Sequence, residues 1–222
     1  MTAQTEDTPQ RPRRRRLVPI ALAALAGAMA GVAGVYGIAS VGRNADAVCH
    51  DAVDTAKRIA PLSRGEIAAL TPAATPLHVP DLTFVDASGH DRTLADWRGR
   101  TVLLNLWATW CVPCRREMPA LDALEAKLGS QQFEVVAINI DPHDAKKARA
   151  WLDDTGVKRL SYYADQDGKA LKSLKLIGRA FGMPTTLLID PAGCEIGTMA
   201  GPAEWASEDG VRLITAALER RS

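Results

Sequence analysis

The segment Trp110-Cys111-Val112-Pro113-Cys114 has the residue types and the spacing of a thiol pair that exchanges disulfides. It follows a nearly continuous apolar run, Thr101 to Trp107, and precedes a helical pattern over residues 113–128. Cys111 is therefore expected at a helix N-terminus, where unpaired N–H groups and the helix dipole favour the thiolate. We expect Cys111 to attack a target disulfide and Cys114 to resolve the mixed disulfide.

Two other uses of a CxxC pair find little support in the neighbouring residues. A structural zinc site needs further Cys or His ligands at short spacing, but there is no second CxxC and the four histidines are scattered. Haem attachment needs His directly after the second cysteine, where Arg115 stands. We expect no metal site, and no cofactor beyond the redox-active disulfide. A copper- or zinc-binding module that uses both thiols as soft ligands remains an alternative from another class.

The amino-terminal residues have the features of a membrane-targeting segment. Five Arg lie between residues 11 and 16, and the 25 residues from Leu17 to Val41 contain no ionisable side chain except Tyr36. As a helix this run extends about 37 Å, enough to cross a hydrocarbon core of about 30 Å. Because basic residues stay in the cytoplasm, we expect a single-pass inner-membrane anchor and a periplasmic body. A cleaved signal peptide is the alternative, since residues 26–30 contain small-residue cleavage patterns; either way the body is exported.

Composition and charge exclude several classes of protein. The 222 residues are 47% hydrophobic and 24% charged, which is typical of a globular chain. The net charge of +1 conceals the basic tail: 22 basic and 24 acidic residues lie beyond residue 16. The weakly acidic remainder of the chain has no cluster of basic residues that would form a positively charged surface for nucleic acid.

The pattern along the chain predicts four segments: a basic tail (1–16), a transmembrane anchor (17–41), a helical extension with a Pro-containing linker (42–79) and a catalytic domain (80–222). Within the last segment, a hairpin is followed by alternating strands and helices and then by a second hairpin. This order predicts an α/β fold whose mixed central sheet is flanked by helices. The strands are expected near 82–85, 93, 101–107, 133–140, 162–163, 185–189 and 194–199, and the helices near 113–128, 144–155, 171–174 and 207–220.

Two cysteines lie outside the CxxC pair. Cys49 falls on an amphipathic helical pattern over residues 46–60, and Cys194 falls in the turn between the last two strands. In an exported, oxidising compartment their even number predicts a structural disulfide. Because the bridge closes a loop of well over 100 residues, it could stabilise the fold by up to ~5 kcal/mol.

The stretch from Leu104 to Pro119, LNLWATWCVPCRREMP, resembles the active-site region of membrane-anchored thioredoxin-like reductases of the TlpA/ResA/CcmG family. Residues 182–190, GMPTTLLID, resemble the cis-proline strand of that family. The similarity covers residues 80–220, and the anchor and second cysteine pair are most similar to its TlpA branch. The resemblance implies a thioredoxin-like fold with an N-terminal β-hairpin and a central strand–helix insertion, about residues 139–175.

The resemblance also implies roles for individual residues near the thiols. Pro184 is expected to be a cis proline that holds the Met183 backbone where an extended target segment can pair with it, and Trp110 lies at the rim. An ordinary trans proline is the alternative.

Glu117 is expected one helical turn beyond Cys114, where such a glutamate tunes the thiols or moves protons. Its alternative is a carboxylate that merely favours the helix start. Thioredoxin itself has a buried Asp where this chain has Asn105, which removes a candidate base and gives Glu117 more importance.

By resemblance, the expected function is reduction of disulfides in target proteins of cytochrome c or cytochrome oxidase copper-site biogenesis. The expected partners are those proteins, a membrane thiol donor of electrons, and lipid around residues 17–41. A disulfide donor is the alternative direction, because CxxC alone does not set the direction of exchange. Peroxiredoxin chemistry is a weaker third possibility.

Overall fold

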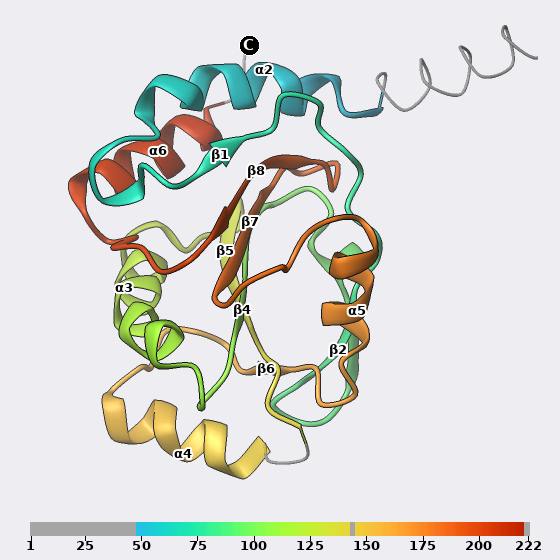
Figure 1. The fold of residues 1–222 in the computed structure, drawn as a ribbon, viewed down its shortest axis with the longest axis vertical. Helices are drawn as coiled ribbons and strands as arrows, with labels where there is room; N and C mark the ends of the chain where they lie inside the picture. The colour runs from blue at the N-terminus through green and yellow to red at the C-terminus, as the bar shows by residue number, and fades with distance from the viewer. Residues whose placement is uncertain (1–47, 143–144, 220–222) are drawn as a thin grey trace, which may run out of the picture. The chain divides into compact units, whose positions relative to one another are not determined.

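The computed structural model describes residues 48–142 and 145–219. The expected basic tail and anchor lie outside these residues. In the part of the chain that is described, no helix has the length and apolar character needed to cross a membrane. The described residues form one compact unit, in which an eight-stranded mixed sheet is flanked by helices (Figure 1).

Most elements form close to where the sequence patterns predict them. The described strands are β1 (Thr71–Pro72), β2 (Thr83–Asp86), β3 (Asp91–Thr93), β4 (Thr101–Trp107), β5 (Phe133–Asn139), β6 (Tyr163–Ala164), β7 (Thr185–Ile189) and β8 (Glu195–Ala200). The described helices are α2 (His50–Ile59), α3 (Val112–Leu128), α4 (Ala145–Thr155), α5 (Lys169–Leu176) and α6 (Glu208–Leu218), with short 3-10 turns at 60–62, 65–67 and 94–97.

Strand β4 is the centre of the sheet, whose order is β1-β8-β7-β4-β5-β6-β2-β3. It pairs parallel to β5 and antiparallel to β7, and all seven of its residues are buried. A strand covered on both faces explains its nearly continuous apolar sequence. Figure 1 shows α3 and α6 on one side of the sheet and α5 on the other. The chain leaving β4 therefore enters α3 at the rim of a well-packed core.

The extension before residue 80 packs as part of the same unit. Strand β1, in the expected linker, pairs antiparallel with β8 and adds an edge to the sheet. Helix α2 packs against α6 and β8, and its Ile59 is fully buried. The residues before and after position 80 therefore pack together in one unit, although the sequence pattern changes there.

A disulfide joins Cys49 to Cys194 across a sequence separation of 145 residues. Cys49 occupies the cap position just before α2 rather than a place within the helix, because α2 begins at His50. Cys194 lies directly before β8 and forms an isolated antiparallel bridge with His78. The bond thus fastens the start of α2 to the sheet, and both sulfur-bearing residues are buried.

Replacing both Cys49 and Cys194 by Ala should lower the free energy of unfolding by about 2–5 kcal/mol, because the unfolded chain loses a long covalent loop. Urea unfolding of the wild type and the double variant, each with the CxxC pair oxidised, measures the difference. Disulfide exchange should persist at a temperature where both proteins are folded. Equal stability of the two proteins would contradict the structural role.

Candidate active site

The Cys111–Cys114 disulfide lies at the first turn of α3. Cys111 is the N-cap residue, and its sulfur accepts a hydrogen bond of 3.2 Å from the backbone N–H of Cys114. The same N–H and the positive end of the helix dipole would stabilise negative charge on this sulfur after reduction. Cys111 is 5% exposed and Cys114 is fully buried, so only the first sulfur is within reach of a target.

A buried carboxylate fixes the loop that leads to Cys111. Asp141, just after β5, accepts hydrogen bonds from the backbone N–H of Thr109 at 3.0 and 3.2 Å. Asn139 donates to the same carboxylate at 2.9 Å. Trp110, the next residue along the loop, is 59% exposed. The hydrogen bonds to Asp141 therefore fix the backbone of the loop, while Trp110 remains at the surface.

The peptide bond between Met183 and Pro184 is cis and lies directly before β7. In the β4–β7 pairing Thr185 stands opposite Leu106, so Pro184 continues the register toward Trp107 and the end of β4. The antiparallel pairing thus brings the cis-proline to the end of the sheet at which the CxxC pair begins α3.

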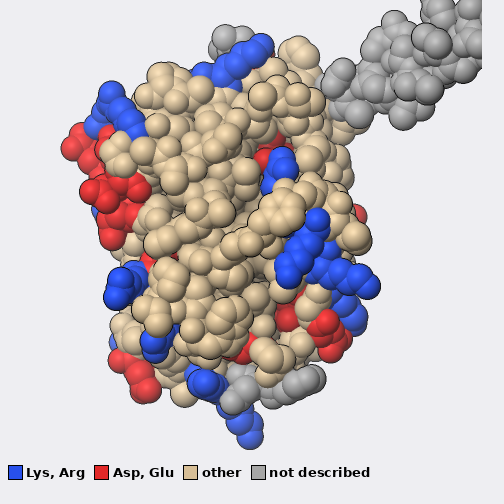
Figure 2. Space-filling view, viewed as in Figure 1, with Lys and Arg blue, Asp and Glu red and all other residues tan. Residues whose placement is uncertain are grey.

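The loop before the cis-proline is held by a partly buried ion pair. Arg179 donates two hydrogen bonds of 2.9 Å to Glu195 on β8, whose side chain is 1% exposed. Ala180 is buried with a left-handed backbone (φ 61°), whereas the next residue, Phe181, is 83% exposed. In Figure 1 this loop crosses the front of the molecule, and in Figure 2 the same region is largely uncharged, with Lys and Arg gathered beside it over α5. The loop therefore presents an apolar side chain from a fixed backbone.

Glu117 is a buried carboxylate, 2% exposed, one helical turn after Cys114. Its Oε1 accepts hydrogen bonds from Trp205 Nε1 at 2.6 Å and from the Ala203 backbone N–H at 3.1 Å. Its Oε2 accepts from Asn105 Nδ2 at 3.1 Å. Burial raises the pKa of Glu117 to about 7, although the three hydrogen bonds favour the charged form. This carboxyl group can take up or release a proton near neutral pH beside the buried sulfur.

Several of these positioning residues carry no local sequence signal. Trp205 is 88 residues from Glu117, and Asp141 is 32 residues from Thr109. Neither belongs to a motif, and each is a polar contact made only when distant elements pack together. The exposed Phe181 is likewise recognisable only from the structure.

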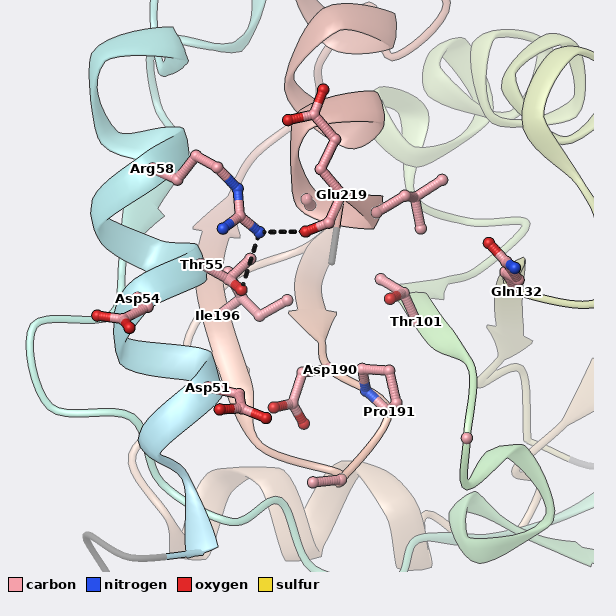
Figure 3. Close-up of a pocket in the computed structure, with 14 residues that line it drawn as sticks. Asp51, Asp54, Thr55, Arg58, Thr101, Gln132, Asp190, Pro191, Ile196 and Glu219 are labelled. Carbon is pink, nitrogen blue, oxygen red and sulfur yellow. Dashed lines mark hydrogen bonds between the residues drawn. The ribbon is translucent and has the colours of Figure 1, made fainter. Parts of the chain in front are cut away.

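A cavity of about 480 Å³ lies elsewhere, between α2, the end of α6 and the turn after β7 (Figure 3). Arg58 borders it and donates to the backbone oxygens of Ala216 and Glu219, both at 2.9 Å. Thr101 at the start of β4 lines the cavity, whereas Cys111 follows the end of that strand. About 20 Å, the length of seven strand residues, separates the two places, so the cavity is not part of the thiol site. Across residues 48–142 and 145–219, no group of three His, Cys, Asp or Glu side chains is arranged to hold a metal ion.

The fold and the thiol pair define a class. A mixed sheet whose central strand leads into a helix headed by CxxC is that of a thioredoxin-like protein, and the fold expected from the sequence is confirmed. A solved structure from Chlorobium tepidum, assigned as a thiol:disulfide interchange protein DsbE, is 31% identical with a TM-score of 0.56. It covers 64% of this chain and 96% of that one.

The chain belongs to the AhpC/TSA family, which residues 77–194 match. The thioredoxin-like protein YneN of Bacillus subtilis is 34% identical over 126 residues, which are 54% of this chain and 70% of that protein. The thiol-disulfide oxidoreductase ResA of Geobacillus kaustophilus is 44% identical over 61 residues. That match spans 28% of this chain and 35% of ResA. These relatives support membership of the TlpA/ResA/CcmG family.

Replacing Glu117 by Gln should change how stability depends on pH. The folded carboxyl has a pKa of about 7 against an ordinary value of 4.5, so folding retains a proton between these two values. The wild type should therefore lose stability, of order 3 kcal/mol, as pH rises from about 4.5 to 7. Glu117→Gln should lack this loss and be the more stable protein at pH 8, as measured by urea unfolding at a series of pH values.

The matched control is Glu66→Gln, because Glu66 is an exposed carboxyl. Its stability profile should follow the wild type. If Glu117→Gln also follows the wild type, Glu117 does not titrate in this range.

Proposed function

We propose that this chain is a thiol:disulfide oxidoreductase that reduces disulfides in target proteins. The observation that carries the proposal is the asymmetric pair at the start of α3. One sulfur, that of Cys111, lies at the helix N-terminus near the surface, and the other, that of Cys114, is buried one turn from Glu117. The names of the relatives, thiol-disulfide oxidoreductase and thiol:disulfide interchange protein, support the same chemistry.

The reaction begins with both thiols reduced. The Cys111 thiolate attacks a target disulfide, a mixed disulfide forms, and one target sulfur leaves as a thiolate that takes up a proton. Cys114 then gives its proton to the Glu117 carboxylate and attacks the Cys111 sulfur. The Cys111–Cys114 disulfide forms, and the second target sulfur leaves as a thiolate that takes up the proton released by Glu117. Two electrons pass from the chain to the target, which becomes a dithiol.

Substrate approach is governed by the side chains that stand out around the pair. Trp110 and Val112, on either side of Cys111, are 59% and 46% exposed, and Phe181, three residues before Pro184, is 83% exposed. The backbone of Met183, directly before β7, is the proposed partner of an extended target segment. The preferred target is therefore a flexible segment with apolar residues around its disulfide.

We further propose that the protein acts in the periplasm, anchored in the inner membrane by residues 17–41. An exported compartment is oxidising, so a reductase there needs electrons from a membrane thiol donor. The targets proposed are proteins of cytochrome c or cytochrome oxidase copper-site biogenesis. Support comes from the basic and apolar amino-terminal sequence and from membership of the TlpA/ResA/CcmG family.

Replacing Cys114 by Ser should trap the mixed disulfide, because the resolving sulfur is gone while Cys111 still attacks. Expressed in its native membrane, the variant should run on non-reducing gels as adducts that dithiothreitol releases, and Cys111→Ser should form none. Mass spectrometry of the adducts then identifies the targets.

Other outcomes of the same experiment point elsewhere. Loss of bound copper or zinc in both variants, without adducts, would support a metal-binding module. For direction, the wild-type pair should have a potential near −250 mV or lower, and a value near about −120 mV would make the chain a disulfide donor.

A further inference from the structure

The side-chain amide of Asn105 is buried and satisfied at one end only. Its Nδ2 donates to Glu117 Oε2 at 3.1 Å and to Thr186 Oγ1 at 2.9 Å. Its Oδ1 is also buried but accepts no hydrogen bond from any residue that the structure describes. A buried amide oxygen normally has a donor, so this unequal arrangement calls for a physical explanation.

The hydrogen bonds of Glu117 determine where the carboxyl can carry a proton. Oε1 already accepts from two groups that can only donate, the Trp205 indole N–H and the Ala203 backbone N–H. A proton on Oε1 would point at one of these donors. When Glu117 is neutral, its proton must therefore be on Oε2, the oxygen that faces Asn105.

The present orientation of Asn105 fits the charged carboxylate, and it fits the neutral acid only if the proton on Oε2 points away from Nδ2. With the proton directed at Asn105, the Nδ2 group would face another donor. Half a turn about the Cβ–Cγ bond exchanges Nδ2 and Oδ1, and this torsion has two broad, nearly equivalent positions. Oδ1 would then accept from Glu117, and the Thr186 hydroxyl, which can donate as well as accept, would supply a second hydrogen bond. Either orientation of the amide makes two hydrogen bonds at the end that faces Glu117 and Thr186, and the opposite end has no partner among the described residues.

We propose that Asn105 is a positioning residue whose amide turns over when Glu117 gains or loses its proton, so that the carboxyl is hydrogen-bonded in both states. The turning of the amide does not depend on the proposed function. Its role in accepting the Cys114 proton rests on that function. A Glu117 that is hydrogen-bonded to Asn105 with and without a proton can accept the Cys114 proton and return it while the backbone of β4 stays in place.

The surroundings leave the amide as the group that can respond. The backbone of Asn105 is fixed, because β4 pairs it with Ala137 on one side and Thr186 on the other. From α3, the titratable group one turn from Glu117 is Cys114. Over the described part of the chain, no charged side chain on β4, β7 or the loop before α6 contributes to the pKa shift of Glu117.

The test is a titration of the oxidised full chain, labelled with ¹³C and ¹⁵N, in which neither thiol titrates. The Asn105 side-chain NH₂ resonances should shift with the same midpoint as the Glu117 carboxyl carbon, near pH 7. In Glu117→Gln, the new amide N–H₂ faces Asn105 as the neutral acid would. Its Asn105 resonances should therefore stay at the low-pH wild-type position throughout the titration.

Asn139 is the internal control, because both ends of its amide are hydrogen-bonded to Asp141. Its NH₂ resonances should not share the Glu117 midpoint. The proposal is overturned if the Asn105 resonances stay fixed while Glu117 titrates, or if they take the high-pH wild-type position in Glu117→Gln. If that variant does not fold, nuclear Overhauser contacts between the Asn105 NH₂ and the Thr186 side chain decide the matter: they should be present at high pH and lost at low pH, and contacts that persist at low pH overturn the proposal. The titration uses no target protein. A failure to trap mixed disulfides would therefore contradict the proposed function without deciding whether the Asn105 amide turns.

Discussion

A carboxylate buried behind a disulfide is the constraint on which this site depends. Glu117 loses the solvation that would keep its pKa near 4.5, and three hydrogen-bond donors among the described residues limit the cost. These donors come from β4 and from the segment before α6, so the central strand, the active-site helix and the last helix must all be in place. The chemistry of the helix terminus thus depends on the packing of the whole domain.

The two disulfides lie at opposite ends of the sheet. β8 runs parallel to β4, because each pairs antiparallel with β7, and Cys194 precedes β8 at the end where β4 begins. The CxxC pair follows the other end of β4. A bond that fastens α2 to the sheet therefore constrains the fold without restricting the exposed rim at which exchange takes place.

Local signals in the sequence predict the elements that carry the thiols. The apolar run of β4, the CxxC at the start of α3 and the turns of the hairpins are all encoded by residues that are neighbours in the chain. The pairing of β1 with β8 was not predicted, because the Pro-containing segment gives the pattern of a linker and its partner lies more than 100 residues away. Trp205 and Asp141 were missed for the same physical reason. Their roles come from long-range polar contacts, whereas Glu117 could be singled out by its helical spacing from Cys114.

In the proposed reaction, Glu117 receives the proton of Cys114 during resolution. The most direct measurement is the rate at which a preformed mixed disulfide at Cys111 releases its thiol, followed from about pH 5 to 9 in the wild type and in Glu117→Gln. The wild-type rate should rise and level off with a midpoint near 7, following ionisation of the carboxyl. The Gln variant should be slower at neutral pH and keep rising at higher pH, as the thiol ionises without a base. Coincident profiles for the two proteins would contradict the account.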